Sequence, residues 1–83
     1  MRYGEAIRAL RDAAGVTQVV LARELGMPPS NLCMRENGSM TATRDEYERA
    51  EEHLLRIVGE RRDSLRKVMD LVRSQLPEEQ VAS

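Results

Sequence analysis

The segment from Thr17 to Gly38, which reads TQVVLARELGMPPSNLCMRENG, constrains the fold more than any other part of the chain. Its apolar residues have the spacing of two short helices that pack against each other: Leu21, Leu25, Met27 and Leu32. Ala22 is small where a second helix would press close, and Gly26 stands where a connecting turn needs a positive φ. The segment therefore predicts two short helices joined by a tight turn.

Length and composition indicate a single all-α domain. A chain of 83 residues supports one compact domain with a modest core. It has no Trp or Phe and only two Tyr, so the core must be aliphatic. No alternating run of β-branched residues predicts a strand. We expect a compact all-α bundle of about four to five helices, with the helix-turn-helix segment inside it.

Capping signals predict the boundaries of the first three helices. The first helix should end at Gly15, and four of its residues share one face: Tyr3, Ile7, Leu10 and Ala14. Thr17 is the expected N-cap of a second helix that runs through Leu25. Pro29 suits the first turn of a third helix, which should run to about Glu36 before an Asn37-Gly38 stop.

The second half of the chain has one helical stripe interrupted by a glycine. Thr43 and Glu46 have the spacing of a capping box at the start of a fourth helix. Its apolar stripe resumes beyond Gly59: Tyr47, Ala50, Leu54, Ile57 or Val58, Leu65, Val68 and Val72. Glycine costs about 1 kcal/mol within a helix, which neighbouring contacts can offset. The residues leave open whether Gly59 divides this stretch into two helices, and we favour one long or slightly bent helix that ends at Pro77.

Several classes of protein are disfavoured by what the chain lacks. Cys33 is the only cysteine and His53 the only histidine, so neither an internal disulfide nor a Cys/His zinc cluster is expected. The sequence shows no nucleophile paired with a base and no Gly-rich phosphate loop, so we do not expect an enzyme. No cofactor is expected either. The chain has no signal-peptide pattern and no run of some 18 apolar residues. We expect a cytoplasmic protein without a membrane segment.

Charge divides unevenly along the chain. Residues 1 to 44 carry six arginines and four acids, whereas residues 45 to 83 carry seven basic and ten acidic groups. The first half is therefore the better candidate for contact with nucleic acid, although so small a difference has little weight alone.

With IRALRDAAGVTQVVLARELG followed by ENG, roughly residues 4 to 58 resemble the phage repressor and Cro-type helix-turn-helix family, also called the XRE family. The resemblance implies a bundle of about five helices, with the third helix in the major groove of double-stranded DNA, and usually a two-fold dimer on a pseudo-palindromic operator. The most specific matches are these: Arg11, Gly15, Thr17-Gln18, Leu21-Ala22, Leu25-Gly26 and Glu36-Asn37-Gly38.

Carried over by position, the resemblance assigns roles to individual residues. Gln18 and Asn37 correspond to phosphate contacts, and Arg11 and Glu36 to a structural pair between the first and third helices. Four positions would face base edges: Pro29, Ser30, Asn31 and Met34.

The expected base-reading positions depart from the family pattern. Relatives often have Gln, Arg or Lys there, whereas Pro29, Cys33 and Met34 offer no strong hydrogen bonds. Only Ser30 and Asn31 read bases well, while Met34 or Pro29 could touch a thymine methyl. Direct readout is therefore thin, and the protein would need DNA shape, a dimer or a second protein on the operator.

Other positions depart from the family in their packing. Arg35 stands where relatives usually bury an apolar side chain, and we expect its guanidinium to reach a phosphate. Val19 and Val20 stand where relatives expose polar residues, so the C-terminal helix or a partner could cover them. Cys33 is expected to be a small buried filler rather than a redox switch.

The C-terminal helix is the expected dimer or partner surface. Five apolar residues are spaced nearly as a coiled-coil seam: Leu54, Val58, Leu65, Val68 and Val72. They could instead pack onto the first helices, but helix beyond about residue 60 exceeds what a small bundle needs. We expect a DNA-binding domain over residues 1–58, a continuous helical extension over 59–76 and a disordered tail over 77–83.

The sequence thus favours a phage or bacterial transcriptional regulator, a repressor or Cro-like switch that binds operator DNA as a homodimer. The alternative is a protein-interaction module on a helix-turn-helix frame, such as an antitoxin or an inhibitor of a phage or host protein. Such a module would bind DNA weakly or without specificity.

Overall fold

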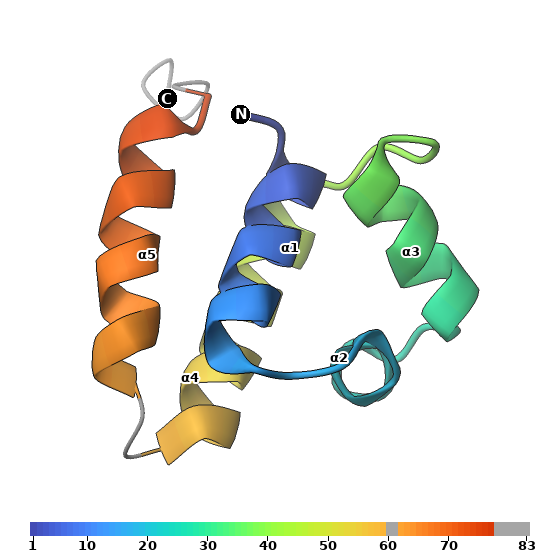
Figure 1. Cartoon of the computed structure of the whole chain (residues 1–83). Coiled ribbons are helices and arrows are strands. Elements are labelled where there is room, and N and C mark those ends of the chain that lie inside the picture. The colour runs from blue at the N-terminus through green and yellow to red at the C-terminus, as the bar shows by residue number, and fades with distance from the viewer. Residues whose placement is uncertain (60–61, 78–83) are drawn as a thin grey trace.

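The computed structural model describes residues 1–59 and 62–77, and every regular element within these ranges is a helix. The elements are α1 (Tyr3–Ala14), α2 (Gln18–Leu25), α3 (Pro29–Asn37), α4 (Arg44–Val58) and α5 (Arg62–Gln75). Helix α1 lies in the middle of the bundle, with α5 on one side and α2 and α3 on the other (Figure 1). The predicted all-α bundle is confirmed. No helix of the described residues is long and apolar enough to cross a membrane.

Local caps set the helix boundaries where the sequence predicts them. The Thr17 hydroxyl accepts a hydrogen bond from the backbone N–H of Val20 at 3.2 Å and so begins α2. Gly26 ends α2 at φ 73°, a left-handed conformation that lets the chain turn sharply into α3. The capping box at α4 is also present. The N–H of Glu46 donates to Thr43 Oγ1 at 3.1 Å, and the N–H of Thr43 donates to Glu46 Oε1 at 3.0 Å.

The core is mostly aliphatic, with Tyr47 also buried in it, and draws on all five helices. Its fully buried large side chains are Ile7, Leu10, Leu21, Leu32, Leu54, Leu65 and Val72. Residues from both ends of the chain therefore share one core.

The prediction of one continuous C-terminal helix is wrong. Helix α4 ends at Val58, and Gly59 has φ 53° and ψ −108°, far from helical values. Helix α5 begins at Arg62 and returns along α1 (Figure 1). The reversal is favourable because it buries Leu65, Met69 and Val72, which a straight helix would leave in water. The predicted tail lies outside the described residues apart from Pro77.

The predicted dimer surface is also wrong, because its residues face the protein's own core. Four of the five are buried within this chain: Leu54, Val58, Leu65 and Val72. The fifth, Val68, is half-buried against the core. Helix α5 is therefore part of the bundle and not an excess beyond it.

Polar contacts fasten α5 to α4. Arg73 Nη2 donates to Glu51 Oε1 at 2.6 Å, and the hydroxyl of Tyr47 donates to Glu51 Oε2 at 2.9 Å. Burial and then the hydrogen bond to Glu51 raise the pKa of Tyr47. The Tyr47 ring packs against Tyr3 of α1 with centroids 5.9 Å apart. One cluster thus joins α1, α4 and α5.

Helices α1 and α3 touch backbone to backbone at Gly4. A Cβ built on Gly4 would overlap the carbonyl group of Arg35. The side-chain hydrogen of glycine is thus the only substituent that this crossing admits. The close packing of α3 against α1 therefore depends on residue 4 having no Cβ.

We predict that Gly4→Ala destabilises the protein by about 1–3 kcal/mol, although alanine is the better helix former. The overlap with the Arg35 carbonyl must be relieved by moving α3. Urea unfolding followed by circular dichroism measures the change. Arg8→Ala, at an exposed position of the same helix, should change stability by less than about 0.5 kcal/mol. Equal stability of Gly4→Ala and the parent chain would contradict the close contact.

We predict that a chain ending at Val58 does not fold cooperatively. It loses three buried apolar side chains of α5, each worth about 1.5–3 kcal/mol. A domain of this size has only about 4–12 kcal/mol of stability in total. Thermal melting by circular dichroism checks this, with full-length Leu71→Ala, an exposed α5 position, as control. A sharp transition in the shortened chain would show that residues 1–58 form a domain by themselves.

Candidate nucleic-acid interface

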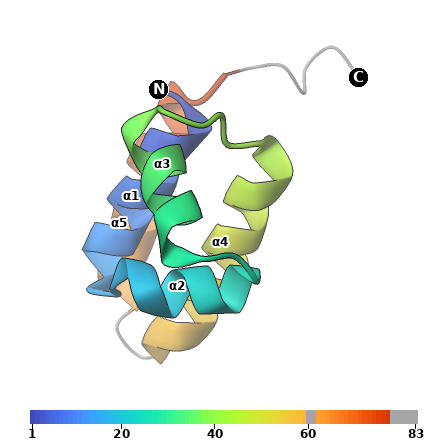
Figure 2. The ribbon, with the colours of Figure 1, turned by 90° about the vertical axis from the view of Figure 1, so that its right-hand side faces the viewer.

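The outer face of α3 is open in the described part of the chain. Four of its residues are exposed and two are half-buried: Pro29, Ser30, Cys33 and Asn37, then Asn31 and Met34. Leu32 and Glu36 point inward and are buried. Figure 2 shows α2 and α3 nearest the viewer, with α1 and α5 behind them. Helix α5 packs on the opposite side of α1 and leaves this face accessible.

A buried ion pair fixes the inner side of α3. Arg11 of α1 donates from Nε to Glu36 Oε2 at 2.8 Å and from Nη2 to Glu36 Oε1 at 2.9 Å. Gln18, the first residue of α2, donates from Nε2 to Glu36 Oε1 at 2.9 Å. The structure thus brings Arg11 and Glu36 together and adds Gln18 to the pair. One carboxylate joins three helices.

The pair is shielded from water, and Nε, Nη1 and Nη2 of Arg11 each donate a hydrogen bond within the protein. The side chain of Glu36 is 2% exposed and that of Arg11 is 12% exposed. Arg11 Nη1 donates to the carbonyl oxygen of Val16 at 2.9 Å. The hydrogen bond to Glu36 raises the pKa of Arg11, against the opposing effect of burial. Bidentate geometry of this kind holds orientation as well as charge, so α3 cannot rotate without breaking it.

Two predicted phosphate contacts lie at helix ends. Gln18 occupies the first turn of α2, and its amide already donates to Glu36. Asn37 is exposed in the last turn of α3, and its Oδ1 accepts the N–H of Ser39 at 2.9 Å. This bond shapes the turn after α3. Contact of either residue with phosphate stays a prediction.

The expectation for Arg35 is wrong, because its guanidinium faces Glu46 at the start of α4. Arg35 Nε lies 3.0 Å from each carboxylate oxygen of Glu46, and both side chains are 16% exposed. Its Nη1 also donates to the carbonyl oxygen of Asn31 at 3.1 Å. Burial acts to raise the pKa of Glu46, but hydrogen bonds from Arg35 and Thr43 outweigh it and lower that pKa. Arg35 thus fastens α3 to α4.

Two further expectations about this face need correction. The C-terminal helix does not cover the apolar residues at the start of α2, since Val19 is 52% and Val20 39% exposed. Cys33 is exposed and not a buried filler. Leu21, Ala22 and Leu32 are among the residues of α2 and α3 that pack into the core. The neighbouring Val19, Val20 and Cys33 therefore face outward.

Cations that the sequence reasoning missed lie beside the loop between α3 and α4. A groove there is lined by the N-terminus of α1 and by this loop, including Arg2, Thr41 and Arg44. Arg2 Nη1 lies 2.9 Å from the place where a Cβ on Gly38 would be. Arg44 pairs with the exposed Glu48 at 3.2 Å. Only the fold could reveal this grouping, because Arg2 and Arg44 are far apart in the sequence.

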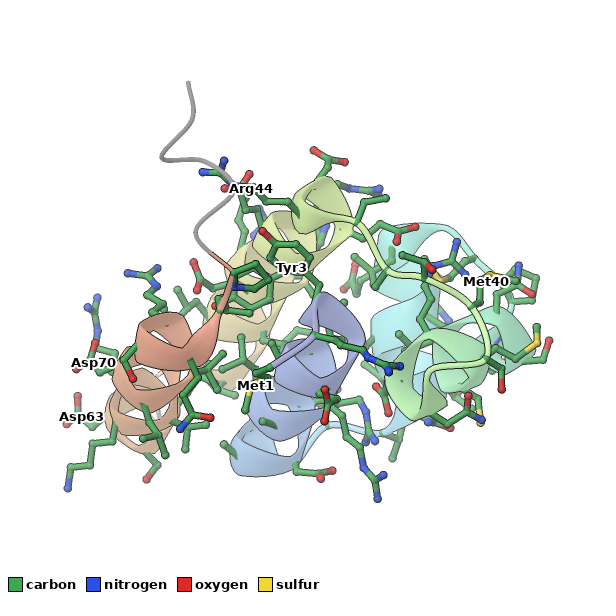
Figure 3. All side chains as sticks on the ribbon, turned by 90° about the horizontal axis from the view of Figure 1, so that it is seen from above. Met1, Tyr3, Met40, Arg44, Asp63 and Asp70 are labelled. Atoms are coloured by element: carbon green, nitrogen blue, oxygen red, sulfur yellow. The ribbon has the colours of Figure 1, made fainter. Side chains whose placement is uncertain are left out.

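Two acids of α5 lie far from α3. In Figure 3 Asp63 and Asp70 of α5 lie on the far side of the molecule from Met40, which follows α3. Both acids are exposed. Helix α5 also carries Arg66, Lys67 and Arg73, so it is not an acidic face. Residues 1–59 and 62–77 contain no cluster of His, Cys, Asp and Glu that could hold a metal ion.

We predict that Arg11→Ala lowers the free energy of unfolding by about 3–5 kcal/mol, because it leaves Glu36 buried without its cation. Arg11→Lys should lie between Arg11→Ala and the parent chain, since an ammonium keeps the charge but loses the planar fork. The double variant Arg11→Met/Glu36→Leu, which removes both charges, should recover much of the loss. Chemical denaturation measures all three. A loss under about 0.5 kcal/mol for Arg11→Ala would contradict the structural role of the pair.

Comparison with known proteins agrees with this geometry. A model of the helix-turn-helix domain family matches residues 2–65, more than half of the chain. Comparison with curated proteins and with solved structures gives no significant match. The match covers all of α1 to α4 and the beginning of α5. The chain therefore belongs to the helix-turn-helix domain family, of the XRE/Cro-like type.

Proposed function

We propose that the protein is a sequence-specific DNA-binding transcriptional regulator that places α3 in the major groove. One observation carries the proposal: α3 has an open outer face, while the Arg11–Glu36–Gln18 network holds its inner face rigidly. A helix in the major groove must project from its domain and keep a fixed orientation. Both conditions are met. The protein then acts as a repressor or Cro-like switch by occupying an operator.

The contacts divide into those that read bases and those that position the protein. Ser30 and Asn31, in the first turn of α3, have the hydrogen-bonding side chains suited to base edges. Gln18 and Asn37 are the proposed phosphate contacts from α2 and α3. Arg2 adds to these, because its Nη1 lies 2.9 Å from the place where a Cβ on Gly38 would be, at the end of α3, and it can neutralise the DNA backbone.

A homodimer on a pseudo-palindromic operator remains part of the proposal. One copy has few strong base-reading groups, and a second copy on a half-site one helical turn away doubles them. Such a dimer would use a surface other than the buried seam of α4 and α5.

A second candidate is a protein-interaction module, and the exposure of Val19 and Val20 favours it. Neighbouring apolar residues left in water are common where another protein binds. A module of this kind would act as an antitoxin or inhibitor. Such a module would bind DNA weakly and without preference for sequence.

We predict that the protein selects a defined sequence from random double-stranded DNA and binds it far more tightly than unselected DNA. Binding should weaken as salt rises, because phosphate contacts release counterions. Asn31→Ala should reduce affinity for the selected site by about 1–3 kcal/mol. Fluorescence anisotropy at two salt concentrations measures both effects.

The matched control is Leu71→Ala, an exposed residue of α5 on the other side of α1, which should bind as the parent chain does. Equal affinity for selected and unselected DNA would overturn the proposal and favour the protein-interaction module.

A further inference from the structure

We propose that α3 recognises thymine chiefly through its C5-methyl group, so that the operator is specified by A·T pairs in the major groove. The inference rests on the proposed function, because it names the base chemistry that the same face reads.

The exposed face of α3 has no cation for the strongest reading of guanine. Guanine is most often read by Arg or Lys, which donate to its O6 and N7. The only charged residues of α3 are Arg35 and Glu36. Arg35 is held by Glu46, and Glu36 is buried against Arg11. No cation of α3 is thus directed outward.

The residues of the open face carry no charge: Ser30, Asn31 and Asn37 are polar, and the other three are apolar. Pro29 and Cys33 are exposed and Met34 is half-buried. Residues four apart share a helix face and are separated by about 6 Å along the axis, close to two base-pair steps of about 3.4 Å. Pro29 and Cys33 have this separation. A carbon or sulfur surface of this kind has one favourable contact in the major groove, the methyl group of thymine.

The polar residues of the same helix favour the same base pairs. An asparagine side chain pairs with the N6 and N7 atoms of adenine, which is the partner of thymine. Asn31 is half-buried, and Arg35 donates to its backbone carbonyl oxygen. Adenine on one strand and the thymine methyl on the other are therefore read by neighbouring residues.

The test replaces thymine with deoxyuridine, which keeps base pairing and removes only the methyl group. The operator is first selected from random double-stranded oligonucleotides, and each thymine is then replaced singly. We expect one or more replacements within the site to weaken binding roughly fourfold each, the value of about one buried methyl group. Replacements in flanking DNA should have no effect and serve as the control.

Protein variants assign the methyl contacts to side chains. In Met34→Ala or Cys33→Ala, replacement of the contacted thymine should cause no further loss, because the side chain that met the methyl is gone. Gln18→Ala should weaken binding to thymine and deoxyuridine operators by equal factors. Cys33 is exposed, so its variant folds even if Met34→Ala does not.

The two proposals fail in different ways. If the protein binds a selected operator tightly but tolerates every deoxyuridine replacement, methyl recognition is wrong and the regulator function stands. If no sequence is preferred over random DNA, the regulator function fails and methyl recognition fails with it.

Discussion

The ion pair between Arg11 and Glu36 is the interaction on which the rest of this structure depends. Burying two charges is costly, and the cost is offset only when geometry is good and the remaining hydrogen-bonding groups are satisfied. Here the pair is bidentate and Gln18 completes it. The same carboxylate touches α1, α2 and α3, so the pair specifies how these helices cross. The open face of α3 is a consequence of that fixed crossing.

The closing of the core by α5 decides which surfaces remain open. Because α5 turns back at Gly59 and fills the side of α1 that α2 and α3 do not cover, its apolar face is used within the fold. The cluster of Tyr47, Glu51 and Arg73 holds it there. The exposed apolar residues that remain on the helix-turn-helix side, Val19 and Val20, belong to α2.

The charged residues of α3 hold the fold together, and its outward residues are uncharged. The scaffold has a buried ion pair, helix caps and a glycine turn, and the outward residues of α3 are half of them apolar and half polar. Arg35, the one cation of α3, is used to join α3 to α4. A surface with little charge gains specificity from shape and methyl contacts more than from strong hydrogen bonds, and it leaves electrostatic attraction to neighbouring segments.

The sequence by itself determined the features that depend on residues a few positions apart. The caps at Thr17 and Thr43, the glycine turn at Gly26 and the helical stripes are of this kind, because each is decided within one or two turns of chain. Only the tertiary structure decided the break at Gly59 and the partner of Arg35. A glycine in a helix costs little, so the choice between bending and continuing was made by burial of α5 against the distant α1. Likewise Arg35 could reach solvent or a carboxylate, and the crossing of α3 with α4 placed Glu46 beside it.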